Sequence, residues 1–142
     1  MDLERKTILF VCTHNSARSQ MAEALVNHLY GDRYQAFSAG TEPTEVHPIA
    51  RRAMSELGMD ISRQQSKSID RFLGRDFEWV VTLCDHAHES CPVFPAGYKR
   101  VHKGFRDPAA AEGDDEERLE AFRMVRDELK EWFEKTVLRT DE

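Results

Sequence analysis

An apolar run at residues 7–11 leads directly into a polar loop at residues 12–19, and a stretch with helical spacing follows. Short runs of branched apolar and aromatic side chains are typical of buried strands, and apolar residues repeated every three or four positions are typical of helices. Backbone N–H groups of a tight strand-to-helix loop point at one spot, and the helix dipole adds partial positive charge there. The chain is therefore predicted to form an anion-binding site where its first strand becomes its first helix.

The side chains of this loop suit a tetrahedral oxyanion. Arg18 carries a planar fork that can hold two oxygens, and the positive field favours the thiolate of Cys12, which is the nucleophilic form. Ser19 can donate a hydrogen bond to the sulfur, and Asn15 tolerates the left-handed backbone that such a loop needs. We expect Cys12 to be the nucleophile and the rest of the loop to bind substrate, namely Thr13, His14, Asn15, Ser16, Ala17, Arg18 and Ser19.

A buried structural cysteine is the alternative interpretation of Cys12, because reduced cysteine is among the residues most often found in protein cores. A cysteine followed by five residues, an arginine and a serine between a strand and a helix favours the catalytic interpretation. The function of the chain is therefore expected at this loop.

Strand and helix signals alternate along the chain, which is typical of the parallel α/β class. Strands are predicted near residues 7–11, 35–38, 77–83 and 100–103. Helices are predicted over residues 17–30 before Gly31, from Pro48 to Gly58, and after the acidic run 112–117, which compensates the dipole of the last helix. Apolar positions on these helices are Met21, Leu25, Leu29, Ile49, Ala53, Met54, Leu57, Leu119, Phe122, Met124, Leu129, Trp132 and Phe133, and the methionines are interpreted as core side chains.

The length of 142 residues fits a single domain, residues 1–142, with a core of its own. A charged fraction of 32% and a net charge of −6 exclude a general affinity for nucleic acid or anionic membranes, so any anion site is built locally. No apolar stretch is long enough to span a membrane, and the N-terminus lacks the apolar core of a signal peptide, so we expect a cytoplasmic protein. Three cysteines are an odd number in a compartment that keeps thiols reduced, which favours reactive thiols over a disulfide framework.

Three predicted strands end in residues that carry chemistry. Cys12 follows the first strand, Cys84 follows the third, and Asp107 lies in the loop after the fourth. Ligands of open α/β sheets bind at the carboxyl ends of the strands, so these groups are expected on one rim. Asp107 is a candidate general acid for a departing hydroxide, although Asp-Pro is also a common turn pair.

The segment between Cys84 and Cys91 has three interpretations. It is a surface loop with incidental thiols, a zinc site formed by Cys84, His86, His88 and Cys91, or a redox relay for electrons that pass through Cys12. If the segment is helical when reduced, its seven residues rise about 10.5 Å, which is beyond the ~7 Å limit for a disulfide. A disulfide between these cysteines would then require the helix to unwind.

Several motifs together resemble the thioredoxin-coupled arsenate reductases, a family with the fold of the low-molecular-weight protein tyrosine phosphatases. The matching segments are residues 12–24, 37–40, 80–84, 91–92 and 104–108, and the resemblance spans nearly the whole chain. It implies a four-stranded parallel sheet flanked by helices, no bound cofactor, and a role in arsenic detoxification. Arsenate is the implied substrate and thioredoxin the implied partner, and we expect a monomer because no apolar stripe is left over once the helices are packed.

The resemblance also implies a sequence of thiol reactions. Cys12 attacks arsenic while Arg18 holds the oxygens and Asp107 assists the loss of water. Cys84 then attacks Cys12, arsenite leaves, and a Cys12–Cys84 disulfide forms. Cys91 next attacks Cys84, and thioredoxin reduces the resulting Cys84–Cys91 disulfide.

One position departs from the family pattern. Some members bind a potassium ion through groups that match Asn15, Glu23 and Ser38 together with an aspartate, but Lys67 occupies the position of that aspartate. The ammonium group of Lys67 can take the place of the cation. We therefore expect activity that does not depend on potassium.

Two other functions compete with arsenate reduction. A low-molecular-weight protein tyrosine phosphatase would use the same loop and aspartate, with a phosphocysteine intermediate at Cys12, but it would need neither Cys84 nor Cys91. Weak phosphatase side activity is expected of an arsenate reductase as well, because arsenate and phosphate are near isosteres. A thiol or metal sensor would instead change a partner interface through Cys84 and Cys91 without turnover.

Overall fold

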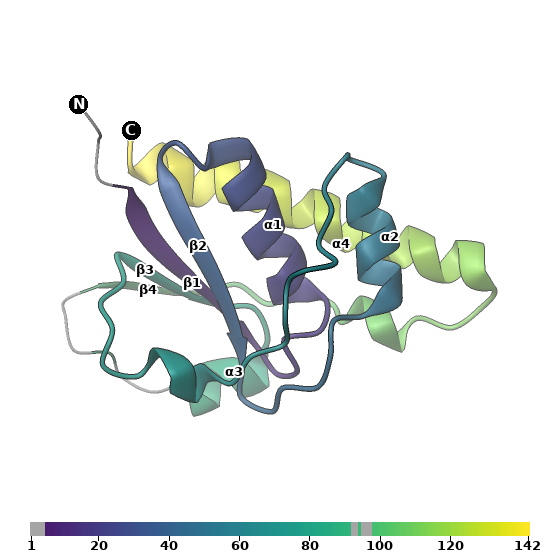
Figure 1. The fold of residues 1–142 in the computed structure, drawn as a ribbon, viewed down its shortest axis with the longest axis horizontal. Coiled ribbons are helices and arrows are strands. Elements are labelled where there is room, and N and C mark those ends of the chain that lie inside the picture. Colours follow the sequence, from purple (N-terminus) through teal and green to yellow (C-terminus); the bar gives the residue numbers. More distant parts are fainter. Residues whose placement is uncertain (1–4, 92–93, 95–97) are drawn as a thin grey trace.

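The fold is a four-stranded parallel sheet covered by helices on both faces. The computed structural model describes residues 5–91, 94 and 98–142. The strands are β1 (Lys6–Cys12), β2 (Tyr34–Gly40), β3 (Trp79–Thr82) and β4 (Lys99–His102), in the spatial order β2-β1-β3-β4 with all pairs parallel (Figure 1). The main helices are α1 (Arg18–Tyr30), α2 (Pro48–Ser55), α3 (Asp85–Ser90) and α4 (Asp115–Trp132), which continues as a π-helical stretch over Phe133–Leu138. The four predicted strands and the α/β class are confirmed.

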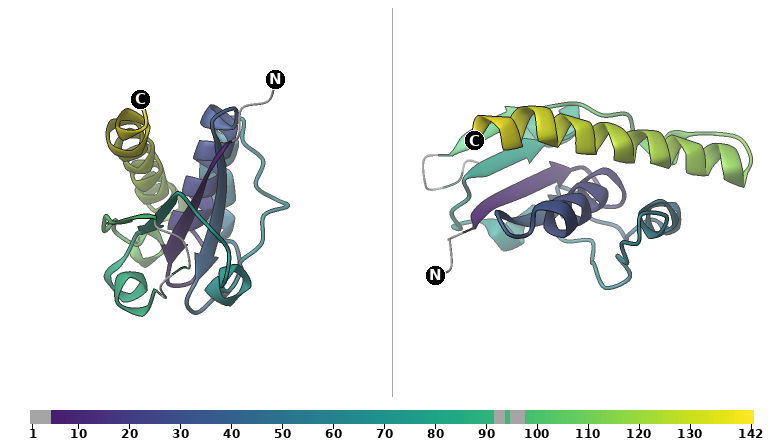
Figure 2. Two further views of the ribbon diagram at one scale, coloured as in Figure 1. Left: turned by 90° about the vertical axis from the view of Figure 1, so that its left-hand side faces the viewer. Right: turned by 90° about the horizontal axis from the view of Figure 1, so that it is seen from above.

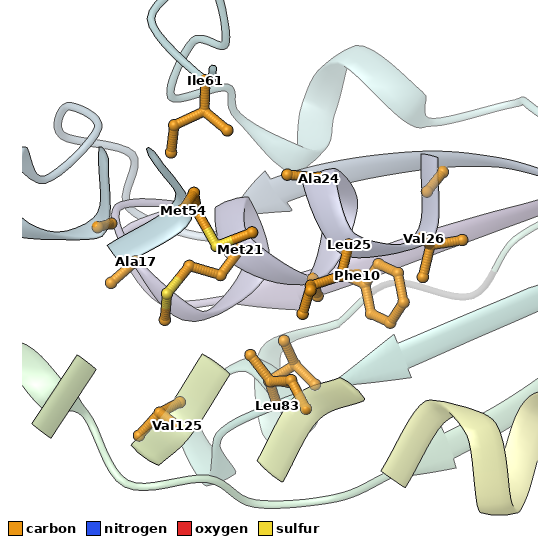
Figure 3. Close-up of a cluster of buried hydrophobic side chains, with 14 of the residues drawn as sticks. Phe10, Ala17, Met21, Ala24, Leu25, Val26, Met54, Ile61, Leu83 and Val125 are labelled. Atoms are coloured by element: carbon orange, nitrogen blue, oxygen red, sulfur yellow. The ribbon is translucent and has the colours of Figure 1, made fainter. Parts of the chain in front are cut away.

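Strand β1 is apolar without alternation because both of its faces are covered. Ile8 and Phe10 belong to the core beneath α1, α2 and α4, whereas Leu9 and Val11 pack with the short helix Ile69–Phe72 and with α3 on the opposite face. Figure 2 shows α1 and α4 over one face of the sheet. The larger core joins side chains from well-separated parts of the chain, as the close-up of Phe10, Met21, Leu25, Met54, Leu83 and Val125 shows (Figure 3).

The helix ends follow local rules. Gly31 follows α1 as predicted. Its φ is an ordinary −64°, so the glycine is not needed for a left-handed backbone. The position instead leaves no room for a side chain, because a Cβ there would lie 2.3 Å from the carbonyl oxygen of Asn27. Regular helix α2 ends at Ser55, three residues before the predicted Gly58. Gly58 has a φ of 75° and closes the turn, in which the N–H of Met59 donates to the carbonyl of Met54 at 3.0 Å.

The acidic run forms the start of α4, whereas the sequence predicted that the helix begins after it. Asp114 is the N-cap and exchanges hydrogen bonds with Glu117 in a capping box, and Asp115–Glu117 lie in the first turn. Acidic residues therefore compensate the helix dipole as predicted, but they do so from within the first turn of α4 and not from the segment before it.

Three apolar positions that were predicted to face the core are exposed. Leu29, Leu57 and Met124 have 42%, 42% and 45% of their surface accessible. Leu29 lies in the last turn of α1, Leu57 follows the end of α2, and Met124 lies on the outer side of α4. The remaining predicted positions are buried except Trp132, which is partly buried against the core.

One carboxylate joins the amino ends of all four strands. The Asp141 side chain is 1% exposed and accepts hydrogen bonds from the hydroxyl of Tyr34 at 2.5 Å and the indole N–H of Trp79 at 2.9 Å. The ammonium groups of Lys6 and Lys99 lie 3.2 and 3.3 Å from it. These four partners are the first residues of β2, β3, β1 and β4 respectively, so the chain after α4 fastens the sheet at the end opposite the cysteine loop.

A search of the helices in the described part of the chain found none with the length and apolar character needed to cross a membrane.

Candidate active site

Cys12 is the last residue of β1, and its sulfur lies beneath the loop that leads to α1. The thiol is buried, and its Sγ is 2.8 Å from the hydroxyl oxygen of Ser19. The amide of Asn15 donates to the same hydroxyl oxygen at 2.7 Å. The Ser19 hydroxyl can therefore donate its one hydrogen to the sulfur while its oxygen accepts from Asn15.

Asn15 adopts the left-handed backbone conformation that the sequence predicted, with a φ of 49°. Its side chain is fully buried, and its oxygen accepts from the backbone N–H of Lys67 at 2.8 Å and from Gln20 at 2.9 Å. Gln20 in turn accepts from Gln64 at 2.7 Å. The side-chain amides of Asn15, Gln20 and Gln64 therefore form a hydrogen-bonded chain that supports the loop.

Sequence reasoning gave Gln20 and Gln64 no role in the site. Gln20 is fully buried and also donates to the carbonyls of Asn15 at 3.0 Å and Gln65 at 2.8 Å. The available signal for Gln20 was its position in the first turn of the helix that follows the loop. No local pattern pointed to Gln64, whose partner is 44 residues away in sequence.

Strand β2 comes very close to the loop at Gly40. A Cβ at this position would lie 2.7 Å from the carbonyl oxygen of Thr13 and 2.8 Å from the N–H nitrogen of Asn15. Only glycine allows this approach, which presses the loop against the end of the sheet.

Arg18 and Asp107 face each other across a small cavity. The Arg18 guanidinium donates to the carbonyl of Phe105 at 3.1 Å and lies 3.9 Å from one oxygen of Asp107. The other Asp107 oxygen accepts from the N–H of Ala109 at 3.0 Å. One oxygen therefore caps a turn while the other lies toward the arginine. This geometry is compatible with Asp107 as a general acid and with Asp107 as a turn residue before proline.

The cavity measures about 60 Å³, which is room for a group the size of a few water molecules. Its lining residues are Cys12, His14, Ser16, Ala17, Arg18, Thr44, Asp107 and Ala109. Thr44, in a segment without regular structure, and Ala109, in the 3-10 turn Pro108–Ala110, were not predicted, because neither carries a sequence signal. Of the loop residues predicted to bind substrate, Thr13, Asn15 and Ser19 are absent from this lining and make contacts that shape the site instead.

Cys84 lies beside the loop, and Cys91 lies at the other end of α3. The sulfur of Cys84 is 3.1 Å from the hydroxyl of Thr13, and both cysteines are reduced. Burial raises the pKa of the Cys91 thiol, and the positive charge of Arg100 opposes that shift. The segment between the two cysteines is helical, which is the condition under which a disulfide between them requires unwinding.

Three of the four residues of the zinc interpretation contact different partners. The Cys84 sulfur contacts Thr13, the His86 ring lies 3.5 Å from a carboxylate oxygen of Glu42, and His88 stacks on His102 with 4.4 Å between the ring centroids. Within the described ranges, no three His, Cys, Asp or Glu side chains are grouped in a way that could hold a metal ion.

The Lys67 ammonium lies beside Ser38 and Glu23, two of the residues that the resemblance assigns to a potassium site. It donates to the carbonyl of Gln65 at 2.8 Å and to Ser38 at 3.4 Å, and lies 3.6 Å from Glu23. Burial lowers the pKa of Lys67, and the Glu23 carboxylate opposes this effect. These residues surround an ammonium, so they do not fit a metal ion while Lys67 stays in place.

Comparison with known proteins places this geometry in a family. The family described as low molecular weight phosphotyrosine protein phosphatase matches residues 7–141. The arsenate reductase of Halalkalibacterium halodurans is 50% identical over 127 residues, which cover 89% of this chain and 91% of that protein. A solved structure of an arsenate reductase in the oxidized state has a TM-score of 0.80 and 34% identity, and the match covers 94% of this chain and 98% of that one.

A further structural relative is the thioredoxin-dependent arsenate reductase of Corynebacterium glutamicum. It has a TM-score of 0.68 and 28% identity, with 98% of this chain and 65% of that chain covered. Since both the family model and these relatives match most of its length, the chain belongs to the low molecular weight phosphotyrosine protein phosphatase family, on the branch of the arsenate reductases.

Proposed function

We propose that this protein, as a single domain over residues 1–142, reduces arsenate to arsenite with Cys12 as the nucleophile and with Cys84 and Cys91 as a thiol relay. The observation that carries the proposal is the position of Cys84, whose sulfur contacts Thr13 inside the nucleophile loop. A phosphatase needs no second thiol at that place. The relatives named above as arsenate reductases support the same substrate.

The size of the cavity favours a small inorganic oxyanion over an aryl phosphate. Its lining consists of loop residues with Thr44, Asp107 and Ala109, and it contains no Phe, Tyr or Trp side chain that could pack against a phenyl ring. Arg18 supplies the positive charge and a planar fork for two oxygens. Phosphate has the same shape, so slow hydrolysis of phosphate monoesters is expected as a side activity.

The proposed reaction begins when the Cys12 thiolate bonds to arsenic and an oxygen leaves as water, with Asp107 passing a proton to it. The Cys84 thiolate then attacks the Cys12 sulfur. The sulfur–arsenic bond breaks, its electron pair stays on arsenic, and arsenite leaves with arsenic reduced by two electrons. The two sulfurs are oxidised to a Cys12–Cys84 disulfide.

Cys91 restores the nucleophile in the next step. Its thiolate attacks Cys84, the Cys12–Cys84 bond breaks, and Cys12 leaves as a thiolate. A reduced dithiol then reduces the Cys84–Cys91 disulfide. We assign this role to thioredoxin, in line with the relative described as thioredoxin-dependent.

A thiol relay of this kind needs a reducing compartment, and we therefore propose a cytoplasmic location. We also propose that the protein acts as a monomer. Within residues 5–91, 94 and 98–142, the large exposed apolar side chains are Leu29, Leu57, Leu73 and Met124, which come from four separate segments.

The test is NADPH oxidation on addition of arsenate in the presence of thioredoxin and thioredoxin reductase. Sustained turnover is expected for the wild type and for Ser90→Ala, a control change beside Cys91, whereas Cys12→Ser and Cys91→Ser should abolish it. An inactive wild type that hydrolyses an aryl phosphate through Cys12 would contradict the proposal and identify a phosphatase.

A further inference from the structure

Helix α3 is held at both ends by the neighbouring edge strand β4. At its start, Asp85 pairs with the ring of His102 at 3.0 Å. At its end, the guanidinium of Arg100 donates to the carbonyl of His88 at 2.9 Å and lies 3.5 Å from the carbonyl of Cys91. Carbonyl groups in the last turn of a helix have no partner within the helix, so a cation there stabilises the turn.

The middle of α3 is anchored as well. Ala87 is fully buried in the core that contains Leu9 and Val11. Glu89 and Ser90, by contrast, are exposed. This exposed last turn, which Arg100 binds, leads directly into Cys91.

A Cys84–Cys91 disulfide requires this turn to open. In a helix the two residues are separated by a rise of about 10.5 Å, and a disulfide needs their Cα atoms within about 7 Å. Any interaction that exists only in the closed turn opposes the disulfide. The two contacts of Arg100 are made to carbonyls of the closed turn and of Cys91 itself.

We propose that Arg100 is a positioning residue that keeps α3 closed and Cys91 apart from Cys84 until Cys84 has reacted with Cys12. The inference rests on the proposed thiol relay. A Cys84–Cys91 disulfide formed too early would leave no thiol to release arsenite from Cys12. Arg100 thus sets the order of the two disulfides.

The charge of Arg100 has a second effect at the same place. Burial raises the pKa of the Cys91 thiol, and Arg100 lowers it. When the turn opens, Cys91 attacks Cys84 as a thiolate, and the electron pair of the Cys12–Cys84 bond leaves on Cys12. The residue that delays the step therefore also favours the reactive form of the attacking thiol.

The first test measures the balance between the dithiol and the Cys84–Cys91 disulfide in glutathione buffers. It uses Cys12→Ser protein, in which these are the two remaining cysteines. Arg100→Met should shift the balance toward the disulfide by roughly tenfold, because it removes hydrogen bonds of a charged donor from the closed turn. The balance in Arg100→Lys should lie between those of the parent and of Arg100→Met. The control Arg51→Met, which removes an equal charge on α2, should have the same balance as the parent. An unchanged balance in Arg100→Met would overturn the proposal.

The second test examines charge in Cys12→Ser, Cys84→Ser protein, where Cys91 is the remaining thiol. The rate of Cys91 alkylation by iodoacetamide should reach its half-maximum at a higher pH in Arg100→Met, and it should keep the parent profile in Arg100→Lys. If Arg100 acted through packing alone, the pH profile of Cys91 alkylation would not depend on whether the replacement side chain carries a positive charge. Identical profiles would overturn the electrostatic part of the proposal.

The two tests need no arsenate, so they are independent of the proposed substrate. If the wild type fails to reduce arsenate while Arg100→Met still shifts the thiol–disulfide balance, the proposed function fails and the role of Arg100 in α3 stands. If arsenate turnover is normal and the balance is unshifted, the proposed function stands and the role of Arg100 fails.

Discussion

We propose that the Ser19 hydroxyl donates its hydrogen to the Cys12 sulfur and so stabilises the thiolate. The amide of Asn15 donates to the Ser19 oxygen, which lies 2.8 Å from the sulfur. A hydrogen bond to a charged group contributes about 1.5–3 kcal/mol. We predict that Ser19→Ala slows alkylation of Cys12 at neutral pH by about 10- to 100-fold. The measurement uses Cys84→Ser, Cys91→Ser protein, with Ser55→Ala on α2 as the control, and an unchanged rate would show that the thiolate is stabilised elsewhere.

Lys67 supplies the second prediction at this scale. Its ammonium lies among Ser38, Glu23 and Gln65, so a metal ion would have to displace it. Arsenate turnover should therefore be the same in potassium and sodium buffers of equal ionic strength. A marked loss in sodium would mean that a metal site exists in spite of the lysine.

The chemistry-bearing residues of the site were predictable because the chain places them at recognisable points. Cys12 ends β1, Cys84 and Asp107 lie in the segments after β3 and β4, and the carboxyl ends of parallel strands meet on one rim. The supports of the loop could not be predicted in this way. Gln64 and Lys67 act through partners 44 and 52 residues away, and no local pattern records such contacts.

At the scale of elements, hydrophobic spacing identified every strand and long helix but overestimated how far each apolar face extends. Leu29, in the last turn of α1, and Leu57, after the end of α2, continue the apolar spacing of their helices but keep 42% of their surface exposed. Met124 lies on a helix whose buried side is already formed by Leu119, Phe122 and Val125. The periodicity of a helix describes its own surface, whereas burial depends on where its neighbours end.

The start of α4 shows a related effect. The acidic residues were assigned to the segment before the helix because they lack apolar spacing, yet Asp114 and Glu117 form the capping box and Asp115 is already helical. Capping depends on single hydrogen bonds, so it can begin a helix before any apolar residue appears.

At the scale of the whole molecule, the sheet has two ends with different roles. The carboxyl ends carry the cysteine loop, and the amino ends meet at Asp141. Burial acts to raise the pKa of Asp141, but hydrogen bonds from Tyr34, Trp79, Lys6 and Lys99 outweigh it and hold that pKa below its ordinary value. A carboxyl with a lowered pKa stabilises the fold above its unfolded-state pKa, and this contribution is lost as the pH falls through the folded-state value.

We predict that Asp141→Asn lowers the free energy of unfolding at pH 7 by about 2 kcal/mol, because two lysines and two neutral donors lose a charged acceptor. Urea unfolding of both proteins measures the difference. It should shrink as the pH falls below about 4, where the carboxyl takes up a proton in the unfolded chain, and it should be lost once the pH has fallen through the lower folded-state pKa. A difference that stays constant from pH 7 to pH 3 would contradict the assigned role of the charge.

The position of Asp141 also has a consequence for the order in which the protein is made. A ribosome releases the cysteine loop and the partners of this carboxylate long before it releases the carboxylate, which is 107 residues from Tyr34. A nascent chain therefore holds its reactive thiol before the charge that joins its strands has been synthesised. A protease that trims the segment behind α4 would return the finished molecule to the same condition.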